Sequence, residues 1–228
     1  MKTPLLFRYS GNKRKIIPLL RSLDIPPKRI VEPYLGSGSF ILSRFEPGLG
    51  IEINKDLVSL WKWLRDEATA SMLFNLAKKV NDAVEAHPDN KPDVRELELE
   101  QGPETYVRIN CSGVYTGQLS GWKLYPQHRL PVKETSKILN RLKNIEIIHG
   151  DASVYEEQDG DVVFIDPPYA ETHGNYKEKA KSGIEGMYNP KQTIDIIDRI
   201  SAPVILTYGN GAKEVFPQYE WHTVIKKK

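Results

Sequence analysis

The fold is decided by the stretch Val162-Val163-Phe164-Ile165-Asp166-Pro167-Pro168-Tyr169, where an unbroken apolar run ends in a carboxylate, two prolines and an aromatic ring. An apolar run without polar alternation is typical of a strand covered on both faces, as in a parallel sheet. Asp166 then follows the carboxyl end of that strand, and ligands of open α/β sheets bind beyond such ends. The stretch therefore predicts a functional site at Asp166, with a strand followed by a simple Asp-Pro turn as the alternative.

Composition limits the classes of protein that the chain can belong to. Its 228 residues are 39% hydrophobic and 27% charged, which is typical of a globular protein with a full core. It has no apolar run of membrane-spanning length and no signal-peptide pattern at its start, so we expect a cytoplasmic protein without membrane contact. With Cys111 as the single cysteine we expect no disulfide and no metal. The net charge of +2 permits nucleic-acid binding but does not by itself indicate it.

A basic, glycine-containing loop lies near the start of the chain, at Phe7-Arg8-Tyr9-Ser10-Gly11-Asn12-Lys13-Arg14-Lys15. Apolar residues at helical spacing follow it. Pro18 would lie in the first turn of a helix that begins near Lys15, where a missing N–H does no harm. Taken alone, the loop is most simply a solvated basic segment.

A strand, a glycine turn and a helix are predicted for residues 29–42, around Glu32-Pro33-Tyr34-Leu35-Gly36-Ser37-Gly38-Ser39. Gly36 and Gly38 carry no side chain where a ligand would approach the backbone, and Ser39 can cap the helix. A nicotinamide-binding loop would need a third glycine at position 41, where this chain has Ile.

A second strand is predicted for Leu49–Ile53, with Glu52 near its end and Asn54 as the cap of the next helix. An acidic side chain at this position can accept hydrogen bonds from both ribose hydroxyls of a bound nucleoside. The alternative is an exposed acid at the end of a strand. Further strands are predicted for residues 145–148, 204–208 and 221–225, and a short helix for 193–200.

The Asp-Pro-Pro-Tyr tetrad resembles the catalytic motif of the amino-methyltransferases, and its Asp form resembles that of the adenine-specific DNA enzymes. The basic loop, the glycine loop and Glu52 resemble the cofactor motifs of that family, in the family's order along the chain. The resemblance implies an α/β Rossmann-like methyltransferase fold with a mostly parallel seven-stranded sheet, and S-adenosylmethionine as cofactor. The implied catalytic residues are Asp166, Pro167, Pro168 and Tyr169. The implied cofactor-binding residues are Tyr9, Ser10, Gly11, Lys13, Glu32, Pro33, Gly36, Ser37, Gly38, Glu52, Asp151 and Asp166.

The tetrad suits chemistry on the exocyclic amine of a nucleobase. The lone pair of such an amine is delocalised into the ring, which makes the nitrogen a poor nucleophile. If the Asp166 carboxylate and the Pro167 carbonyl accept its two N–H groups, they can aim the lone pair at a methyl group. Tyr169 would stack on the base, which must be flipped out of a duplex to be reached.

The middle of the chain resembles the family's inserted target-recognition subdomain. Helical stripes at residues 57–84 are predicted to face a core, Met72 and Leu73 among them. Residues 106–122 lack helical or strand period and are predicted to form a loop that suits phosphates and base edges, with a glycine-rich hairpin as the alternative. The resemblance implies a recognition subdomain at residues 55–140 and a catalytic domain at residues 1–54 and 141–228. The residues predicted to contact DNA are Arg108, Asn110, Tyr115, Thr116, Gly117, Lys123 and Arg129.

The resemblance implies a site-specific enzyme that methylates the N6 amine of a flipped-out adenine in double-stranded DNA. We expect a monomer, and a cognate restriction nuclease is a candidate partner. One alternative keeps the cofactor and changes the acceptor to adenine in RNA, the N4 amine of cytosine in DNA or a protein glutamine. Asp166 favours adenine in DNA, because related families more often have Ser or Asn at that position. A catalytically silent nucleic-acid-binding protein with the same fold is a further alternative.

Overall fold

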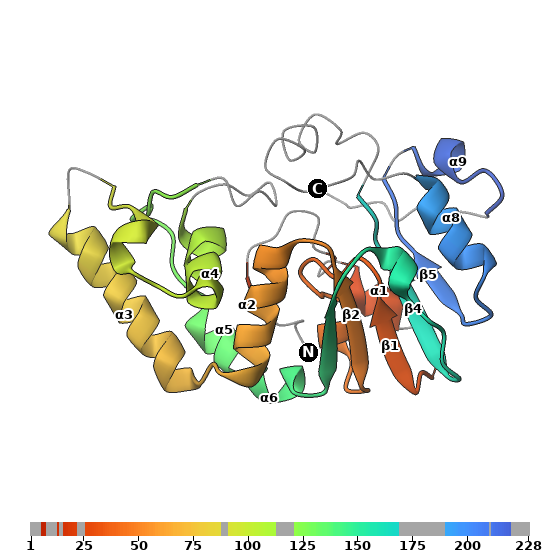
Figure 1. The fold of residues 1–228 in the computed structure, drawn as a ribbon, viewed down its shortest axis with the longest axis horizontal. Helices are drawn as coiled ribbons and strands as arrows, with labels where there is room; N and C mark the ends of the chain where they lie inside the picture. The colour runs from red at the N-terminus through yellow and green to blue at the C-terminus, as the bar shows by residue number, and fades with distance from the viewer. Residues whose placement is uncertain are drawn as a thin grey trace.

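The computed structural model describes residues 6–7, 13, 16–21, 26–87, 91–112, 121–168, 190–209 and 211–219. At its centre is a sheet of five parallel strands in the order β3-β2-β1-β4-β5 (Figure 1). The strands are β1 (Arg29–Glu32), β2 (Gly48–Glu52), β3 (Ile145–His149), β4 (Asp161–Ile165) and β5 (Val204–Leu206). The predicted parallel α/β sheet is confirmed at five strands, and the strand predicted at residues 221–225 lies outside the described residues.

The strand order reverses at β1, which lies between β2 and β4. Ile30 pairs with Gly48 on one side and with Val162 on the other. A reversal of this kind opens a crevice beyond the carboxyl ends of the strands, where ligands of doubly wound sheets bind. The loops after β1, β2 and β4 therefore meet at this edge.

Helices and short 3-10 turns connect the strands. The helices are α1 (Ile17–Arg21), α2 (Lys55–Asp66), α3 (Ala70–Ala86), α4 (Gln101–Cys111), α5 (Val132–Ser136), α6 (Leu139–Leu142), α8 (Pro190–Asp198) and α9 (Ala212–Val215). The 3-10 turns are η1 (Ile41–Ser43), η2 (Val94–Leu97) and η3 (Ala152–Val154). No described helix has the length and apolar content needed to cross a membrane.

The two faces of the sheet follow the alternation of side chains along each strand. Ile30 and Phe164 point into the larger apolar cluster, together with residues of α1 and α2. Val31 and Val163 point into a smaller cluster on the opposite face, which includes Ile196 of α8. Successive side chains of a strand point to opposite faces. Each strand therefore contributes alternate residues to the larger cluster and to the cluster that contains Ile196 of α8.

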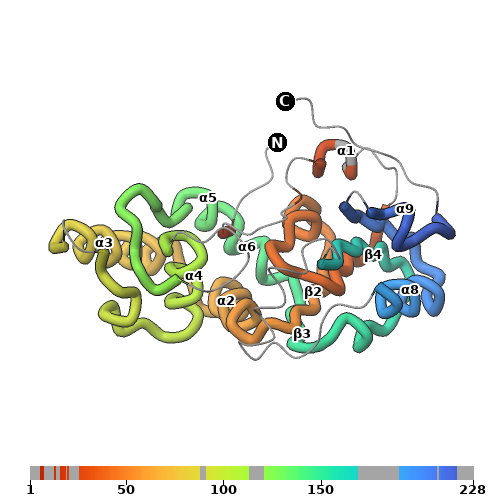
Figure 2. The backbone as a smooth tube through the Cα atoms, turned by 90° about the horizontal axis from the view of Figure 1, so that it is seen from above, coloured from red at the N-terminus to blue at the C-terminus, as the bar shows by residue number. Residues whose placement is uncertain are grey.

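The helices of the middle segment, residues 55–140, extend from one side of the sheet, with α8 and α9 on the other side (Figure 2). Helix α2 lies between α4 and the sheet, since it packs both on α4 and on β2 and β3. The larger apolar cluster continues without interruption from Phe164 in the sheet to Leu73 on α3 and Val94 on η2. The middle segment therefore shares its core with the sheet.

Three local predictions were wrong. The helix predicted after the glycine loop is only the 3-10 turn η1, and the hydroxyl of Ser39 bonds Ser37 Oγ at 2.9 Å instead of capping it. The loop predicted from residue 106 begins inside α4, where Thr105, Tyr106, Val107 and Arg108 are buried in succession and therefore show no amphipathic period. Met72 is 41% exposed, because the buried stripe of α3 consists of Leu73, Leu76 and Val80.

Candidate active site

Three acidic side chains end neighbouring strands on the same face of the sheet. Glu32 is the last residue of β1, Glu52 the last of β2, and Asp166 follows β4 directly. Glu32 lies two residues after Ile30 and Asp166 two after Phe164, so both continue the row that faces the larger cluster. Parallel pairing thus gathers these side chains at one end of the sheet.

Asp166 is held through both carboxylate oxygens. Lys13 Nζ donates to Oδ2 at 2.5 Å, and Thr207 Oγ1 donates to Oδ1 at 2.8 Å. The Asp166 side chain keeps 20% of its surface exposed, while Pro167 is buried. The arrangement leaves a charged acceptor oriented at the open end of β4. Tyr169 lies outside the described residues.

Glu32 is fully buried beneath this site. Its Oε1 accepts the backbone N–H of Ile41 at 2.5 Å. Burial raises the pKa of the Glu32 carboxyl to about 8, and the negative charge of Asp166 adds to the rise. The hydrogen bond from the backbone N–H of Ile41 lowers this pKa but does not offset the effect of burial. We therefore expect Glu32 to be protonated at neutral pH.

Glu32 should make stability depend on pH. The folded-state pKa of about 8 lies above the ordinary value of 4.5, so the protonated carboxyl stabilises the fold at low pH and this contribution is lost as pH rises through 8. We expect the free energy of unfolding of the wild type to fall by about 1.4 kcal/mol at most for each pH unit between these values. Glu32→Gln should flatten this part of the profile. Urea unfolding at a series of pH values measures it, with exposed Glu67→Gln as control; equal profiles for both variants would refute the assignment.

The glycine loop after β1 is built into a backbone shape that favours glycine. Gly36 has φ +45° and Gly38 has φ +57°, both in the left-handed region. A Cβ on Gly38 would lie 2.6 Å from Cη2 of the Trp61 ring, which lies under the loop. The same ring donates from Nε1 to the Gly36 carbonyl at 3.0 Å. The loop is thus supported from α2 and has no room for a side chain at Gly38.

Glu52 ties the glycine loop to the end of β2. Its Oε2 accepts the N–H of Gly36 at 2.9 Å, and its Oε1 accepts the N–H of Asn54 at 2.8 Å. A carboxylate has about four lone-pair sites, so these contacts are compatible with further acceptance from ligand hydroxyls. Asp151 is half-buried at the end of β3, and its Oδ1 accepts the Ser153 N–H at 2.9 Å.

The structure brings most of the predicted cofactor residues to this one edge of the sheet. The described members of the set are Lys13, Glu32, Pro33, Gly36, Ser37, Gly38, Glu52, Asp151 and Asp166. Tyr9, Ser10 and Gly11 lie outside the described residues. No group of three or more His, Cys, Asp or Glu side chains in the described part of the chain is arranged to hold a metal ion.

Arg108 and Asn110, both predicted to contact DNA, are buried in the middle segment. The Arg108 guanidinium lies 3.8 Å from the centre of the Trp122 ring and pairs with Glu104 at 3.6 Å. Asn110 is 1% exposed and donates from Nδ2 to the Tyr106 carbonyl at 2.9 Å. In this conformation both side chains hold the segment together and face away from solvent.

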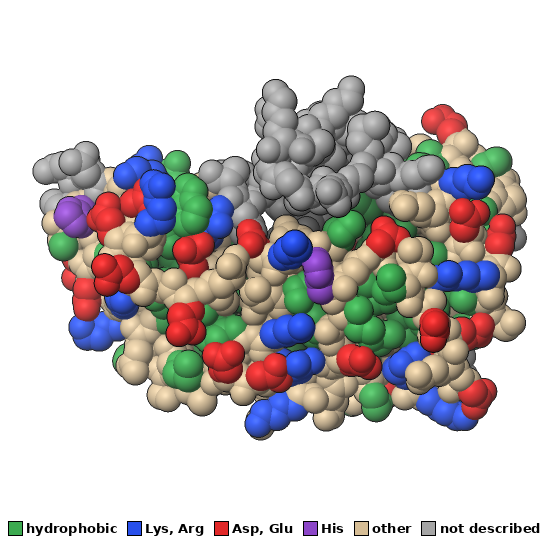
Figure 3. All heavy atoms as spheres, viewed as in Figure 1, with side chains coloured by type: hydrophobic (Ala, Val, Ile, Leu, Met, Phe, Trp, Pro, Cys, Tyr) green, Lys and Arg blue, Asp and Glu red, His purple; other side chains and the backbone are tan. Residues whose placement is uncertain are grey.

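Lys123 and Arg129 are exposed, as DNA-contacting residues must be. Lys123 Nζ lies 3.8 Å from the Asp93 carboxylate, and Arg129 donates to the His128 carbonyl at 3.0 Å. Figure 3 shows acidic and basic side chains interspersed over the face that it displays. The predicted Tyr115, Thr116 and Gly117 lie outside the described residues.

Thr207 and Trp61 are site residues that sequence reasoning missed. Thr207 continues the row of Ile205 on β5, and the same two-residue step that relates Phe164 to Asp166 would have found it. Trp61 was assigned to the core by its helical spacing, and it is buried there, but its ring also supports the glycine loop. No local pattern signals that contact.

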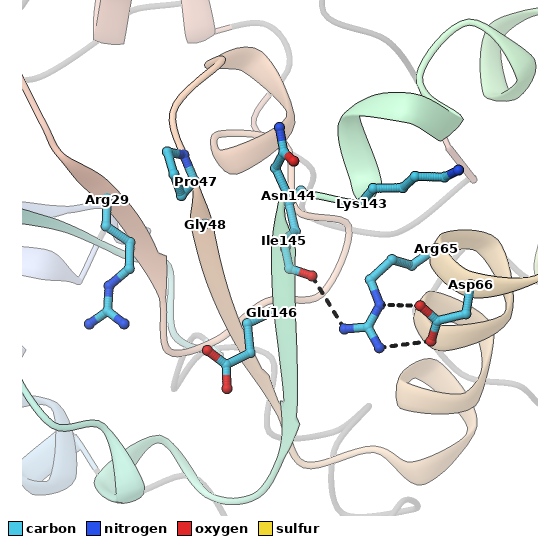
Figure 4. A pocket seen from close by; sticks show the side chains of 9 residues that line it. All are labelled: Arg29, Pro47, Gly48, Arg65, Asp66, Lys143, Asn144, Ile145 and Glu146. Carbon is cyan, nitrogen blue, oxygen red and sulfur yellow. Dashed lines mark hydrogen bonds and ion pairs between the residues drawn. The ribbon is translucent and has the colours of Figure 1, made fainter.

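An open hollow lies at the opposite, amino end of the sheet (Figure 4). Its charged side chains include Arg29 and Arg65, which are bound to Asp161 at 2.8 Å and Asp66 at 2.7 Å. The hollow lies at the opposite end of the strands from Asp166, and both of its arginines are used in structural pairs. We therefore assign it no part in the site.

The parallel sheet with its reversal at β1 defines a Rossmann-type α/β protein, and the polar groups beyond the carboxyl ends of its strands form the candidate site. Within this class, the chain belongs to the family of D12 class N6 adenine-specific DNA methyltransferases, which it matches over residues 9–224. The family implies a methyl donor. Asp166 and the glycine loop both lie within the matched range.

Three relatives illustrate the similarity. The retron Ec67 DNA adenine methylase of Escherichia coli is 26% identical over 190 residues, which cover 75% of this chain and 65% of the relative. The type II methyltransferase M1.LlaDCHI of Lactococcus lactis subsp. cremoris is 24% identical over 186 residues, 71% of this chain and 64% of the relative. The DNA N-6-adenine-methyltransferase of Escherichia phage P1 is 25% identical over 181 residues, 72% of this chain and 24% of the relative. The chain thus spans less than two thirds of the length of each of these relatives.

Proposed function

We propose that this chain transfers a methyl group from S-adenosylmethionine to the N6 amine of a flipped-out adenine in double-stranded DNA. The observation that carries the proposal is the Asp166 carboxylate, oriented by Lys13 and Thr207 at the carboxyl end of β4. Family membership supports the choice of acceptor. The carboxyl edge of the sheet is where such a fold binds its ligands.

The donor chemistry of S-adenosylmethionine fits the residues at this edge. Its ribose hydroxyls, adenine amine and methionine ammonium all donate hydrogen bonds, and the edge offers the acceptors Glu52, Asp151 and Asp166. Gly36 carries no side chain and leaves the backbone of the loop approachable. When bound, the cofactor supplies an activated methyl group on a positively charged sulfur. We propose that Tyr9, Ser10, Gly11, Lys13, Glu32, Pro33 and Ser37 complete its site.

Asp166 and Pro167 act on the acceptor. The carboxylate of Asp166 and the carbonyl of Pro167 accept the two N–H groups of the target amine, which holds the nitrogen in a geometry from which its lone pair can attack. Tyr169 stacks on the flipped base, and Pro168 stiffens the turn between them. The protein thus contributes orientation and a fixed negative charge.

A competing function uses the same site on another amine. Adenine in RNA, the N4 amine of cytosine in DNA and the side-chain amide of a protein glutamine present similar N–H groups. The carboxylate at position 166 and the family match both favour adenine in DNA. A silent nucleic-acid-binding protein would not need the cofactor loop.

Methylation of random-sequence double-stranded DNA tests the proposal. The full chain is incubated with S-adenosylmethionine carrying a labelled methyl group and, in separate reactions, with the DNA, an RNA or a glutamine-containing peptide. Modified bases in the DNA are mapped by sequencing. We expect label on N6 of adenine at one short sequence. Label on cytosine, transfer only to RNA or to a glutamine-containing peptide, or cofactor binding without transfer to any acceptor would each refute it.

We propose that the middle segment, residues 55–140, faces DNA and that a single copy of the chain binds it. Lys123 and Arg129 are the exposed cations of the predicted set, and Tyr115, Thr116 and Gly117 stay predicted DNA contacts. Arg108 and Asn110 support the segment from inside. Association with a cognate nuclease stays a prediction.

DNA affinity should depend steeply on salt. If Lys123 neutralises a phosphate, Lys123→Gln should lower the slope of log affinity against log salt concentration by about one. Fluorescence anisotropy with a labelled duplex measures the slope. Lys28→Gln is the matched control, because Lys28 is exposed and paired with Asp159 at the amino end of the sheet. Equal slopes for Lys123→Gln and the wild type would remove Lys123 from the DNA surface.

A further inference from the structure

Thr207 comes to the site through strand pairing. The ladder between β4 and β5 pairs Ile165 with Leu206, and one step further the Thr207 N–H donates to the Ile165 carbonyl at 2.9 Å. The backbone at Thr207 is thus fixed to the strand that carries Asp166. Residue 207 is half-buried and lies where the sheet ends.

The Thr207 hydroxyl bonds the carboxylate that the proposed reaction uses. Oγ1 donates to Asp166 Oδ1 at 2.8 Å, while Lys13 occupies Oδ2. The last torsion of an Asp side chain is broad, so a carboxylate at a strand end has no preferred plane of its own. A β-branched donor such as Thr is stiff at χ1 and can fix that plane. Thr207 is therefore suited to set the angle at which Asp166 meets an incoming amine.

Lys13 does not make Thr207 redundant. Lys13 has a long, rotatable side chain on a segment outside the sheet, whereas Thr207 is held on a neighbouring strand by the ladder. An ammonium group attracts the carboxylate but imposes little direction, because its three N–H groups rotate. Of these two partners, the hydroxyl is therefore the one that gives the carboxylate a direction.

We propose that Thr207 is a positioning residue for methyl transfer, which holds the Asp166 carboxylate in the plane needed to accept the N–H of the target amine. The proposal rests on the proposed function of the site. It predicts that the Thr207 hydroxyl acts on the rate of the chemical step far more than on cofactor binding, in which Glu52 and Asp151 also take part.

Thr207→Val and Thr207→Ser test it, because Val keeps the shape and Ser keeps the hydroxyl. On a duplex methylated by the wild type, we expect Thr207→Val to slow single-turnover transfer by about 10- to 100-fold, the range expected for a lost hydrogen bond to a charged group. Thr207→Ser should retain most of the wild-type rate. Calorimetry should show a change in cofactor affinity that is far smaller than the change in rate for Thr207→Val, and none for Thr207→Ser.

Ile205→Val on the same strand controls for disturbance of β5 and should keep the wild-type rate. If Thr207→Val does not fold, Thr207→Ala replaces it beside Thr207→Ser, and the rate is read in the same way. Wild-type rates for the variant without a hydroxyl, or an equally slow Thr207→Ser, would overturn the role of Thr207 alone. A wild type that methylates no DNA would overturn the proposed function instead.

Discussion

Asp166→Asn should slow methyl transfer by roughly two to three orders of magnitude, the loss seen when one preorganised charge-stabilising contact is removed. The carboxamide keeps the shape of the side chain but replaces the negative charge with a weaker acceptor and a donor. Thr207 can still donate to the oxygen of the new amide. The NH₂ group of the amide then takes the position of Oδ2, where it faces Lys13 and the incoming amine. The target nitrogen then meets a donor where it needs an acceptor.

Cofactor affinity should change far less than the rate. The loop that carries Gly36 and the Glu52 contacts lie on other strands and are unaffected by the substitution. Single-turnover methylation measured beside cofactor titration separates the two effects. Transfer at the wild-type rate by Asp166→Asn would show that the carboxylate is structural and would refute the mechanism proposed for this site.

Gly36→Val should abolish detectable cofactor binding. The residue has φ +45°, where a β-branched side chain is strained, and its N–H and carbonyl are held by Glu52 and Trp61. The new side chain also projects from the loop that we propose the cofactor contacts. We expect a loss of folding stability of about 1–3 kcal/mol from the backbone strain alone.

Gly160→Val separates strain from loss of the site. Gly160 also has positive φ, at +84°, and an added Cβ there would meet the side chain of Lys28 at the amino end of the sheet. This variant should lose stability but keep the cofactor affinity of the wild type, as measured by thermal unfolding and calorimetry. Wild-type affinity in a folded Gly36→Val protein would remove the loop from the cofactor site.

Local patterns were sufficient to predict the elements that position the site. The apolar runs before Glu32, Glu52 and Asp166 mark buried strands, and parallel pairing of such strands brings their ends together whatever the rest of the chain does. The glycine loop was also visible, because glycine at a strand end signals backbone that other residues avoid.

The features that sequence reasoning missed depend on partners distant in the chain. Thr207 matters because β5 pairs with β4 in one register, and a single residue of slip would turn its hydroxyl to the other face. Arg108 was predicted to contact DNA because residues 106–122 were interpreted as a loop, yet Trp122 and Glu104 provide a buried environment for the guanidinium. The residue types alone predict neither the strand register at Thr207 nor the burial of Arg108.

The continuous core between the sheet and the middle segment fixes a distance. Since Leu73 and Val94 pack in the same cluster as Phe164, one close-packed core connects the segment proposed to face DNA with the strand that carries Asp166. A continuous core of this kind keeps the DNA-contacting surface and Asp166 at a fixed separation. The methylated adenine should therefore lie a constant number of base pairs from the bases that the middle segment contacts. Base pairs inserted between the contacted bases and the target adenine should therefore abolish methylation, and they should not move it to another adenine.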